Sequence, residues 1–281
     1  MSLSGITKAI QEYRQTKKNT NKVMNDLICG DNIEILKGLD DNIIDLTVTS
    51  PPYDKLRQYN GFSFDLDGII KELLRVTKEG GVVVWVVGDE TKNGNESGTS
   101  FKQALKFKEL GWNLWDTMIY QKNQYPPNCM SQKRYAQVFE YMFVFSKGKV
   151  NTFNRLMRPN KTAGQLSGKA RFIVQRDGIK RQYGKNKSKV IHVESVRESI
   201  WKYNTGKASG DILNPHPAVF PESLVRDHIL SWSNEGDVVL DIFVGSGTTC
   251  KVAKELGRNY IGIDISKEYI DISKQRIKGF N

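Results

Sequence analysis

The segment Ser50-Pro51-Pro52-Tyr53 places a hydroxyl, two prolines and an aromatic ring directly after a short apolar run. That run, Ile43 to Val48, is rich in β-branched residues and predicts a buried strand. Because prolines interrupt strand pairing and disfavour helix in the residue before them, the chain should leave the sheet as a stiff, extended loop. Its hydroxyl, carbonyl oxygens and ring are suited to holding a flat polar ring. The alternative is an ordinary turn braced by proline.

A second segment, Val238 to Thr249, predicts a strand, a glycine-rich turn and the start of a helix. Gly245 and Gly247 allow the turn to approach a ligand closely, and the amides that open the helix favour negative or polar groups. A further predicted strand ends at Asp264, 19 residues after Gly245, where an acid reaches ribose hydroxyls in nucleotide-binding βαβ units. Cys250 replaces the third glycine of the dinucleotide pattern, which disfavours a nicotinamide nucleotide. A tight turn with a structural acid is the alternative.

Together these segments resemble those of DNA amino-methyltransferases, in the class whose catalytic motif precedes the cofactor motif. Ser50-Pro51-Pro52-Tyr53 matches the catalytic motif in its serine form, and Phe243 to Thr249 matches the S-adenosylmethionine motif. His216 to Leu224 resembles the segment that leads into the cofactor motif, and Gly30-Asp31-Asn32 resembles the one whose acid lies on the cofactor's adenine side. Ile242 stands where the family usually has proline, a change that should affect only loop stiffness.

The resemblance covers most of the chain and implies S-adenosyl-L-methionine as the cofactor, with no metal. The catalytic residues that it implies are Ser50, Pro51, Pro52 and Tyr53. The cofactor-binding residues that it implies are Asp31, Asp241, Phe243, Gly245, Ser246, Gly247, Thr248 and Asp264. For Asp241, a hydrogen bond to the cofactor's amino-acid portion and a structural role in capping the turn are both open.

The implied chemistry is methylation of an amine on a nucleobase, whose lone pair is delocalised into the ring. The Ser50 hydroxyl and the Pro51 carbonyl can hold the two amine hydrogens and so favour a pyramidal nitrogen with an available lone pair. The prolines carry no amide hydrogen that would repel those of the base. Tyr53 offers a face for stacking, which is worth about 1–3 kcal/mol per base. Catalysis is then mainly by positioning.

The base must be flipped out of the duplex, because a paired base cannot reach the loop. Methylation of a ring carbon would need a cysteine nucleophile, yet Cys129 is separated from Pro127 by Asn128. Serine ahead of the prolines resembles the cytosine-amine subgroup, so N4 of cytosine is the expected target, with N6 of adenine as the alternative. RNA methylation, and a non-catalytic nucleic-acid-binding protein that retains a degenerate fold, are the other hypotheses.

Positive charge is concentrated in one region of the chain. Residues 147–207 contain sixteen lysines and arginines against three acidic residues, a net charge of +13, whereas the whole chain carries +11. A protein whose remaining residues are close to neutral overall can bind the phosphate backbone of a nucleic acid through one basic segment. The resemblance places the target-recognition region in this segment. The candidate DNA-binding residues are Arg155, Arg158, Lys169, Arg171, Arg176, Lys180, Arg181 and Lys185. A solvated charged loop is the alternative.

Cysteine usage and hydropathy favour a cytoplasmic protein. The three cysteines (29, 129 and 250) and three histidines form no paired spacing, which argues against a disulfide scaffold or a zinc cluster. The polar amino terminus shows no signal peptide, and the longest apolar run, Val82 to Val87, is too short to span a membrane. We therefore expect double-stranded DNA as the partner, with no membrane. A cognate restriction endonuclease acting separately and a homodimer are both open options.

Strands that alternate with helices predict an α/β fold, a doubly wound and mostly parallel sheet of the S-adenosylmethionine-dependent methyltransferase type. An amphipathic helix is predicted from Asp65 to Thr77 and should end at Gly80-Gly81, while Val82 to Val87 should form a central parallel strand. The predicted organisation is a polar amino-terminal segment (1–25), a catalytic half (26–146), a basic target-recognition region (147–207) and a cofactor-binding half (208–281). Ligands of such sheets lie beyond the carboxyl ends of the strands.

Overall fold

The computed structural model of the chain describes residues 23–52, 64–123, 133–167, 171–174, 177–183, 189–204 and 220–279. These residues belong to two compact units. The larger unit is formed by Met1–Asn154 together with Ser199–Asn281, and the smaller unit is Arg155–Glu198. Tyr53 lies outside the described residues.

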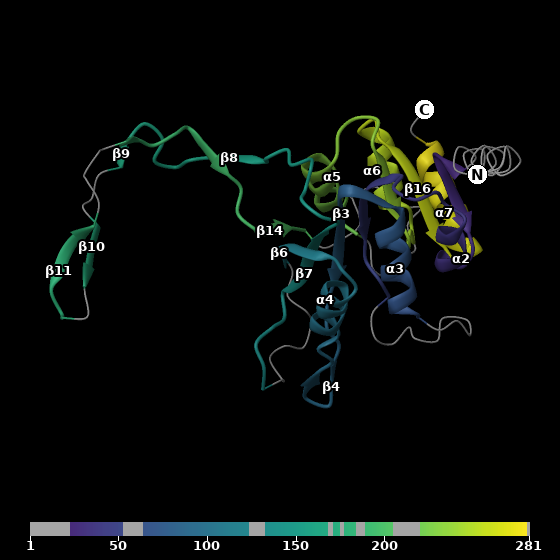
Figure 1. Cartoon of the computed structure of the whole chain (residues 1–281), viewed down its shortest axis with the longest axis horizontal. Coiled ribbons are helices and arrows are strands. Elements are labelled where there is room, and N and C mark those ends of the chain that lie inside the picture. The colour runs from purple at the N-terminus through teal and green to yellow at the C-terminus, as the bar shows by residue number, and fades with distance from the viewer. Residues whose placement is uncertain are drawn as a thin grey trace, which may run out of the picture. The chain divides into compact units, whose positions relative to one another are not determined.

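The larger unit is built on an eight-stranded sheet of order β1-β16-β15-β2-β3-β7-β6-β14 (Figure 1). Its strands are β1 (Asp26–Cys29), β2 (Ile44–Thr49), β3 (Thr77–Val87), β6 (Asn113–Lys122), β7 (Phe139–Ser146), β14 (Ile200–Tyr203), β15 (Val238–Asp241) and β16 (Asn259–Asp264). The strands from β1 to β3 in this order are mutually parallel. Strand β7 is antiparallel to both β3 and β6, and β14 is parallel to β6. The mostly parallel sheet predicted from the sequence is confirmed.

Six helices of the described residues cover this sheet in two groups. They are α2 (Asn32–Lys37), α3 (Leu66–Val76), α4 (Thr99–Glu109), α5 (Glu222–Trp232), α6 (Thr248–Glu255) and α7 (Lys267–Lys278). Helices α2, α3 and α4 contact one another in succession, and so do α5, α6 and α7. Three of the helices begin at side-chain caps, because Asp31, Asp65 and Ser266 each accept a hydrogen bond from an amide of the first turn.

The core lies on both faces of the sheet. Every residue from Val82 to Val87 is buried, which requires helices above and below β3. On one face Trp85 meets Phe107 of α4 with ring centroids 5.1 Å apart, and Phe107 stacks on Phe145 at 4.1 Å. The doubly wound architecture is therefore confirmed. The prediction of a purely parallel environment for Val82 to Val87 is wrong in one respect, because β7 pairs antiparallel with this strand.

The prediction that Gly80-Gly81 would end helix α3 is also wrong. The helix ends at Val76, and β3 begins at the next residue, Thr77. The pairing with β2 shifts register between Ile44 and Leu46, so the two glycines lie in a bulge of β3. Gly80 has φ of 79°, a left-handed conformation that glycine adopts without strain.

The described residues of the smaller unit form three short antiparallel strand pairs. Its strands are β8 (Met157–Pro159), β9 (Leu166–Ser167), β10 (Arg171–Val174), β11 (Lys180–Tyr183), β12 (Lys189–Val190) and β13 (Glu194–Val196). The pairs are β8 with β13, β9 with β12, and β10 with β11. This unit falls within the basic region 147–207, but that predicted range is too wide, because Ile200–Tyr203 forms β14 of the main sheet.

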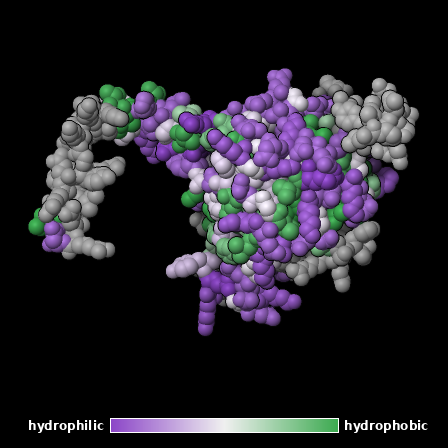
Figure 2. All heavy atoms as spheres, in the orientation of Figure 1, coloured by the Kyte–Doolittle hydropathy of each residue, from purple (hydrophilic) through white to green (hydrophobic). Residues whose placement is uncertain are grey.

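The remaining described strands, β4 (Thr91–Lys92) and β5 (Asn95–Glu96), form a small hairpin in the larger unit. Figure 2 shows hydrophilic residues over most of the visible face of that unit, with hydrophobic residues in separate places. Every helix among the described residues is too short or too polar to cross a lipid bilayer.

Candidate functional site

Two sequence motifs begin side by side at one edge of the sheet. Strands β2 and β15 are parallel neighbours, with Leu46 opposite Val239 and Thr47 opposite Leu240. Because parallel strands end at the same edge, the last residues of the two strands, Thr49 and Asp241, lie close together. The proline-rich loop follows Thr49 directly, and the glycine-rich turn follows Asp241. Ligands of α/β sheets bind at this edge.

A buried hydrogen bond joins the two strand ends. The Thr49 hydroxyl donates to Oδ1 of Asp241 at 2.7 Å, and the amide of Phe243 donates to the same oxygen at 3.1 Å. Thr49 is fully buried and Asp241 is 3% exposed. Burial raises the pKa of Asp241 from its ordinary value of 3.8 to about 6, although these hydrogen bonds oppose the shift. The carboxylate is thus a buried acceptor shared by both loops.

Asp264 holds the glycine-rich turn from the neighbouring strand. Its Oδ2 accepts the amide of Gly245 at 2.9 Å, and its Oδ1 accepts the amide of Ser266 at 2.9 Å. The backbone oxygen of Asp264 accepts the amide of Gly30 at 2.9 Å, which places the end of β1 at the same edge. Asp264 was predicted as a cofactor residue from its distance to Gly245 along the sequence, and in the structure it contacts that glycine directly.

The Gly30-Asp31-Asn32 segment reaches the same group of loops. Asp31 caps helix α2 by accepting the Glu34 amide at 3.0 Å. The side-chain amide of Asn32 donates to the backbone oxygen of Ile242 at 3.5 Å, a long contact between α2 and the glycine-rich turn. The predicted cofactor residues Asp31, Asp241, Gly245 and Asp264 are therefore brought together, whereas their contacts with a cofactor stay predictions.

Gly247 is required for packing against a helix. Its φ is 82°, and a Cβ added there would lie 2.7 Å from Cβ and 3.1 Å from Cα of Ser273 in α7. The Ser273 hydroxyl donates to the backbone oxygen of Gly245 at 2.7 Å. The sequence suggested that this glycine leaves room for a ligand, but the space that its missing side chain leaves is filled by α7.

Arg276 of α7 is a site residue that the sequence analysis missed. It is 6% exposed, and its guanidinium donates to the backbone oxygen of Ser246 and, at 3.3 Å, to the Thr248 hydroxyl. It also pairs with Glu222 of α5 at 3.1 Å. The hydroxyls of Ser246 and Thr248 thus both accept hydrogen bonds from a buried arginine, at 3.2 and 3.3 Å. The available signal was an arginine at the buried position of an amphipathic helix, three residues after Ser273.

The rest of the site consists of the proline-rich loop and aromatic residues. Pro51 is buried, while Ser50 and Pro52 are partly buried. Phe243 lies with its ring centroid 5.9 Å from that of Phe64 and 6.2 Å from that of Trp85, so it joins the glycine-rich turn to the core.

The comparison with protein families decides the identity of this arrangement. The model of the family described as DNA methylase, which covers N6 and N4 methyltransferases, matches residues 44–275. This chain belongs to the DNA methylase family. The resemblance noted on the catalytic and cofactor motifs is confirmed, since both motifs lie inside the matched residues.

Individual relatives agree. The orphan methyltransferase M.BamHII of Bacillus amyloliquefaciens is 52% identical over 248 residues, which cover 87% of this DNA methylase and 92% of M.BamHII. Among solved structures, the PvuII DNA methyltransferase, described as cytosine-N4-specific, matches with a TM-score of 0.68 and 20% identity over 89% of this chain and 85% of its own. The complex of M1.HpyAVI with S-adenosylmethionine matches with a TM-score of 0.58 and 22% identity over 90% and 98%. The two structures support the fold.

The basic residues of this DNA methylase are only partly described. Arg155 is exposed, whereas Arg158 forms an ion pair with Glu198 at 2.8 Å. Arg171, Lys180 and Arg181 lie on the β10–β11 hairpin. The other predicted DNA-binding residues, Lys169, Arg176 and Lys185, are outside the described residues, as is His216. DNA contact by these residues stays a prediction.

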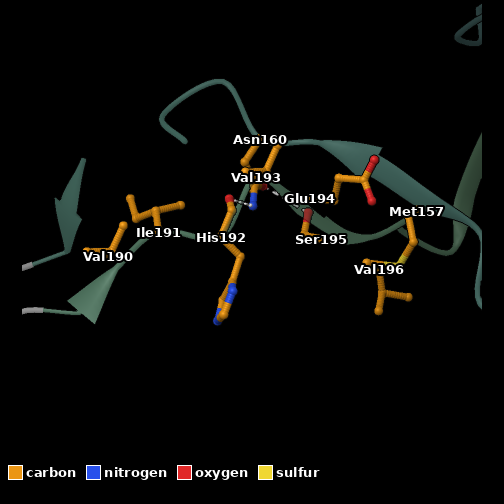
Figure 3. Close-up of a pocket in the computed structure, with 9 residues that line it drawn as sticks. All are labelled: Met157, Asn160, Val190, Ile191, His192, Val193, Glu194, Ser195 and Val196. Carbon is orange, nitrogen blue, oxygen red and sulfur yellow. Dashed lines mark hydrogen bonds between the residues drawn. The ribbon is translucent and has the colours of Figure 1, made fainter. Parts of the chain in front are cut away.

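Asn160, directly after β8, is bonded to residues around the start of β13 in the smaller unit. Its side-chain amide donates to the backbone oxygen of His192 at 2.9 Å, and its Oδ1 accepts the Ser195 hydroxyl at 2.9 Å. Figure 3 shows a shallow pocket around this residue, with Met157 and Val196 at one end and Val190 at the other. The smaller unit therefore combines its positive charge with exposed apolar side chains.

Proposed function

We propose that this DNA methylase transfers a methyl group to the N4 amine of cytosine in double-stranded DNA. The observation that carries this proposal is the place of Ser50, which follows the buried end of β2 beside the glycine-rich turn. A serine offers one neutral hydroxyl, which can accept an amine hydrogen and donate to the acceptor ring nitrogen beside the amine. Cytosine and adenine both present this pair of groups, so the choice of cytosine rests on the serine form of the motif. By resemblance, aspartate or asparagine is usual at this position in adenine methyltransferases.

The methyl donor of this proposal is S-adenosyl-L-methionine, and the residues at the sheet edge fit it. A carboxylate oxygen has more than one acceptor site, so each Asp264 oxygen can accept a ribose hydroxyl in addition to its backbone amide. Asp31, at the end of β1, would lie on the adenine side, and the turn at Gly245 would lie against the amino-acid portion. When bound, the donor supplies an electrophilic methyl group on a sulfonium.

The chain's own residues then prepare the base. The Ser50 hydroxyl and the Pro51 carbonyl accept the two hydrogens of the cytosine amine, which favours a pyramidal nitrogen with an available lone pair. Neither Pro51 nor Pro52 has an amide hydrogen to repel those hydrogens. The reaction needs no covalent intermediate with the protein, so the contribution of these residues is positioning. Tyr53, proposed to stack on the base, completes the loop in the sequence.

Double-stranded DNA is the substrate of the proposed reaction, and the target base is flipped out to reach Ser50. The basic residues of the smaller unit are proposed to bind phosphates, whose negative charge such residues neutralise. A cognate restriction endonuclease acting separately and a homodimer stay predictions from the sequence.

Product analysis tests the proposal. The full-length protein is incubated with genomic DNA from a bacterial strain without DNA methyltransferases and with methyl-labelled donor, and the DNA is digested to nucleosides for mass spectrometry. We expect labelled N4-methylcytosine, and Ser50→Ala should abolish most of it. Labelled N6-methyladenine would overturn the choice of base, and the absence of any labelled nucleoside would overturn the proposed activity.

A further inference from the structure

The link between the two loops continues where the backbone pairing of their strands stops. The β2–β15 ladder ends with Thr47 opposite Leu240. The hydrogen bond from Thr49 to Asp241, 2.7 Å long, carries the connection two residues further along β2. Thr49 is the residue immediately before Ser50, so the bond fixes the strand at the point where the catalytic loop leaves the sheet.

One oxygen of Asp241 serves both loops. Oδ1 accepts the Thr49 hydroxyl from the catalytic side and the Phe243 amide from the glycine-rich turn. Since both bonds converge on the same atom, a displacement of either loop stretches a bond to the other. The geometry is that of a bridge between the base-binding loop and the donor-binding turn.

Helix α6 contacts the end of β2 through its first turn. The Thr249 hydroxyl donates to the Val48 backbone oxygen at 3.3 Å. Thr249 is 1% exposed. The end of β2 is therefore held by α6 in addition to the bond from Thr49 to Asp241.

We propose, on the basis of the function proposed above, that Asp241 is a positioning residue that sets the catalytic loop against the donor-binding turn through Thr49. Asp241 is buried behind the two loops and accepts hydrogen bonds from Thr49 and Phe243, so it acts through them. A displacement of about 1 Å between reacting groups can lower a rate about 100-fold, which is the scale on which such a bridge matters.

The chain supplies a matched control on the same strand. Thr47 is buried two residues before Thr49, and among the described residues its hydroxyl has no hydrogen-bond partner. Replacement of either threonine by valine keeps the branched shape and removes the hydroxyl. Thr49→Val therefore removes the bridge, whereas Thr47→Val removes an unused hydroxyl from the same environment.

The test compares Thr49→Val, Thr49→Ser and Thr47→Val in the full-length protein. Methyl transfer to genomic DNA from a methyltransferase-free strain gives turnover at saturating donor, and calorimetry gives the dissociation constant of S-adenosylmethionine. We expect Thr49→Val to lower turnover about 10- to 100-fold with donor affinity nearly unchanged. Thr49→Ser, which restores the hydroxyl, should recover most of the turnover, and Thr47→Val should behave as wild type.

A second measurement is independent of activity. In the protein without donor or DNA, the backbone amides of Ser50 and Phe243 should exchange with solvent faster in Thr49→Val than in Thr47→Val. Wild-type turnover in Thr49→Val, equal losses of turnover and donor affinity, or equal losses in both valine variants would overturn the positioning role. A wild-type protein that methylates no DNA would instead overturn the proposed function, while the exchange measurement would still report on the bridge.

Discussion

The buried guanidinium of Arg276 donates to the backbone oxygen of Ser246, so that helix α7 holds the glycine-rich turn from the side of the protein interior. The same side chain pairs with Glu222 at 3.1 Å, and Glu222 pairs with Lys251 of α6 at 2.6 Å. Three helices are thus fastened around one turn. The turn that is proposed to bind the donor is therefore held by groups that lie behind it.

Replacement of Arg276 by methionine should destabilise the protein. The variant keeps an apolar stem but leaves the Ser246 carbonyl and the Thr248 hydroxyl without their charged donor, and hydrogen bonds of this kind contribute about 1.5–3 kcal/mol each. We expect a loss of about 2–4 kcal/mol in the free energy of unfolding, measured by denaturant titration. Lys274→Met, on the same helix but with its ammonium 4.0 Å from exposed Asp26, should stay close to wild type. Equal stability of the two variants would contradict the role of Arg276.

Gly247→Ala should be much more harmful than a glycine replacement with the same backbone strain. Gly236 has φ of 85° and no atom within 4 Å of an added Cβ, whereas at Gly247 the Cβ would meet Ser273. Both variants pay about 1–2 kcal/mol for a left-handed alanine, and overpacking adds about 1–3 kcal/mol at Gly247 alone. The difference in unfolding free energy between Gly236→Ala and Gly247→Ala isolates the packing contribution, and a difference near zero would show that α7 yields easily.

The sequence could predict the elements of the site but not the contacts behind them. The patterns around Ser50, Gly245 and Asp264 depend on short-range rules of strand, turn and helix, and the structure places these residues at one sheet edge. The packing role of Gly247 was missed, because its neighbour Ser273 is 26 residues away and nothing local reports that contact.

Arg276 was missed for the same reason, because its role depends on hydrogen-bond partners in a turn and a helix that are distant in the sequence. The bulge at Gly80-Gly81 shows the opposite failure. A local rule for ending a helix was applied where pairing of β3 with its neighbour determined the backbone.

Asp264→Ala should weaken both the fold and the binding of the donor. The variant leaves the amides of Gly245 and Ser266 without their acceptor and removes the proposed ribose contact. We expect a loss of about 2–3 kcal/mol in unfolding free energy and a large fall in S-adenosylmethionine affinity, measured by denaturation and calorimetry. Asp271→Ala removes a nearby carboxylate that pairs only with exposed Lys267 in the described contacts, so it serves as the control. Unchanged donor affinity in Asp264→Ala would exclude the ribose contact.

The buried carboxylate of Asp241 should make stability depend on pH between about 4 and 6. Its pKa in the folded protein is raised to about 6 from an ordinary value of 3.8, chiefly by burial and also by the negative charge of Asp264. A raised pKa means that the folded state binds the proton more tightly than the unfolded state. The stabilisation is therefore complete below the unfolded value and is lost as the pH rises through the folded value.

Asp241→Asn isolates this effect, because the amide oxygen can still accept from Thr49 and Phe243 while the side chain no longer ionises in this range. The groups that face Asp241 in the folded protein are Thr49, Thr249, Asp264 and Cys250, and each is retained in the variant. Each pKa unit corresponds to 1.36 kcal/mol, and part of the change lies below pH 4, so the unfolding free energy of the wild type, relative to the variant, should fall by about 2 kcal/mol from pH 4 to pH 7. Denaturant titrations of both proteins across this range give that difference directly. If the difference in unfolding free energy does not change with pH, Asp241 has an ordinary pKa in the folded protein. If the difference rises with pH, the folded protein stabilises the ionised carboxylate of Asp241, and burial does not dominate its pKa.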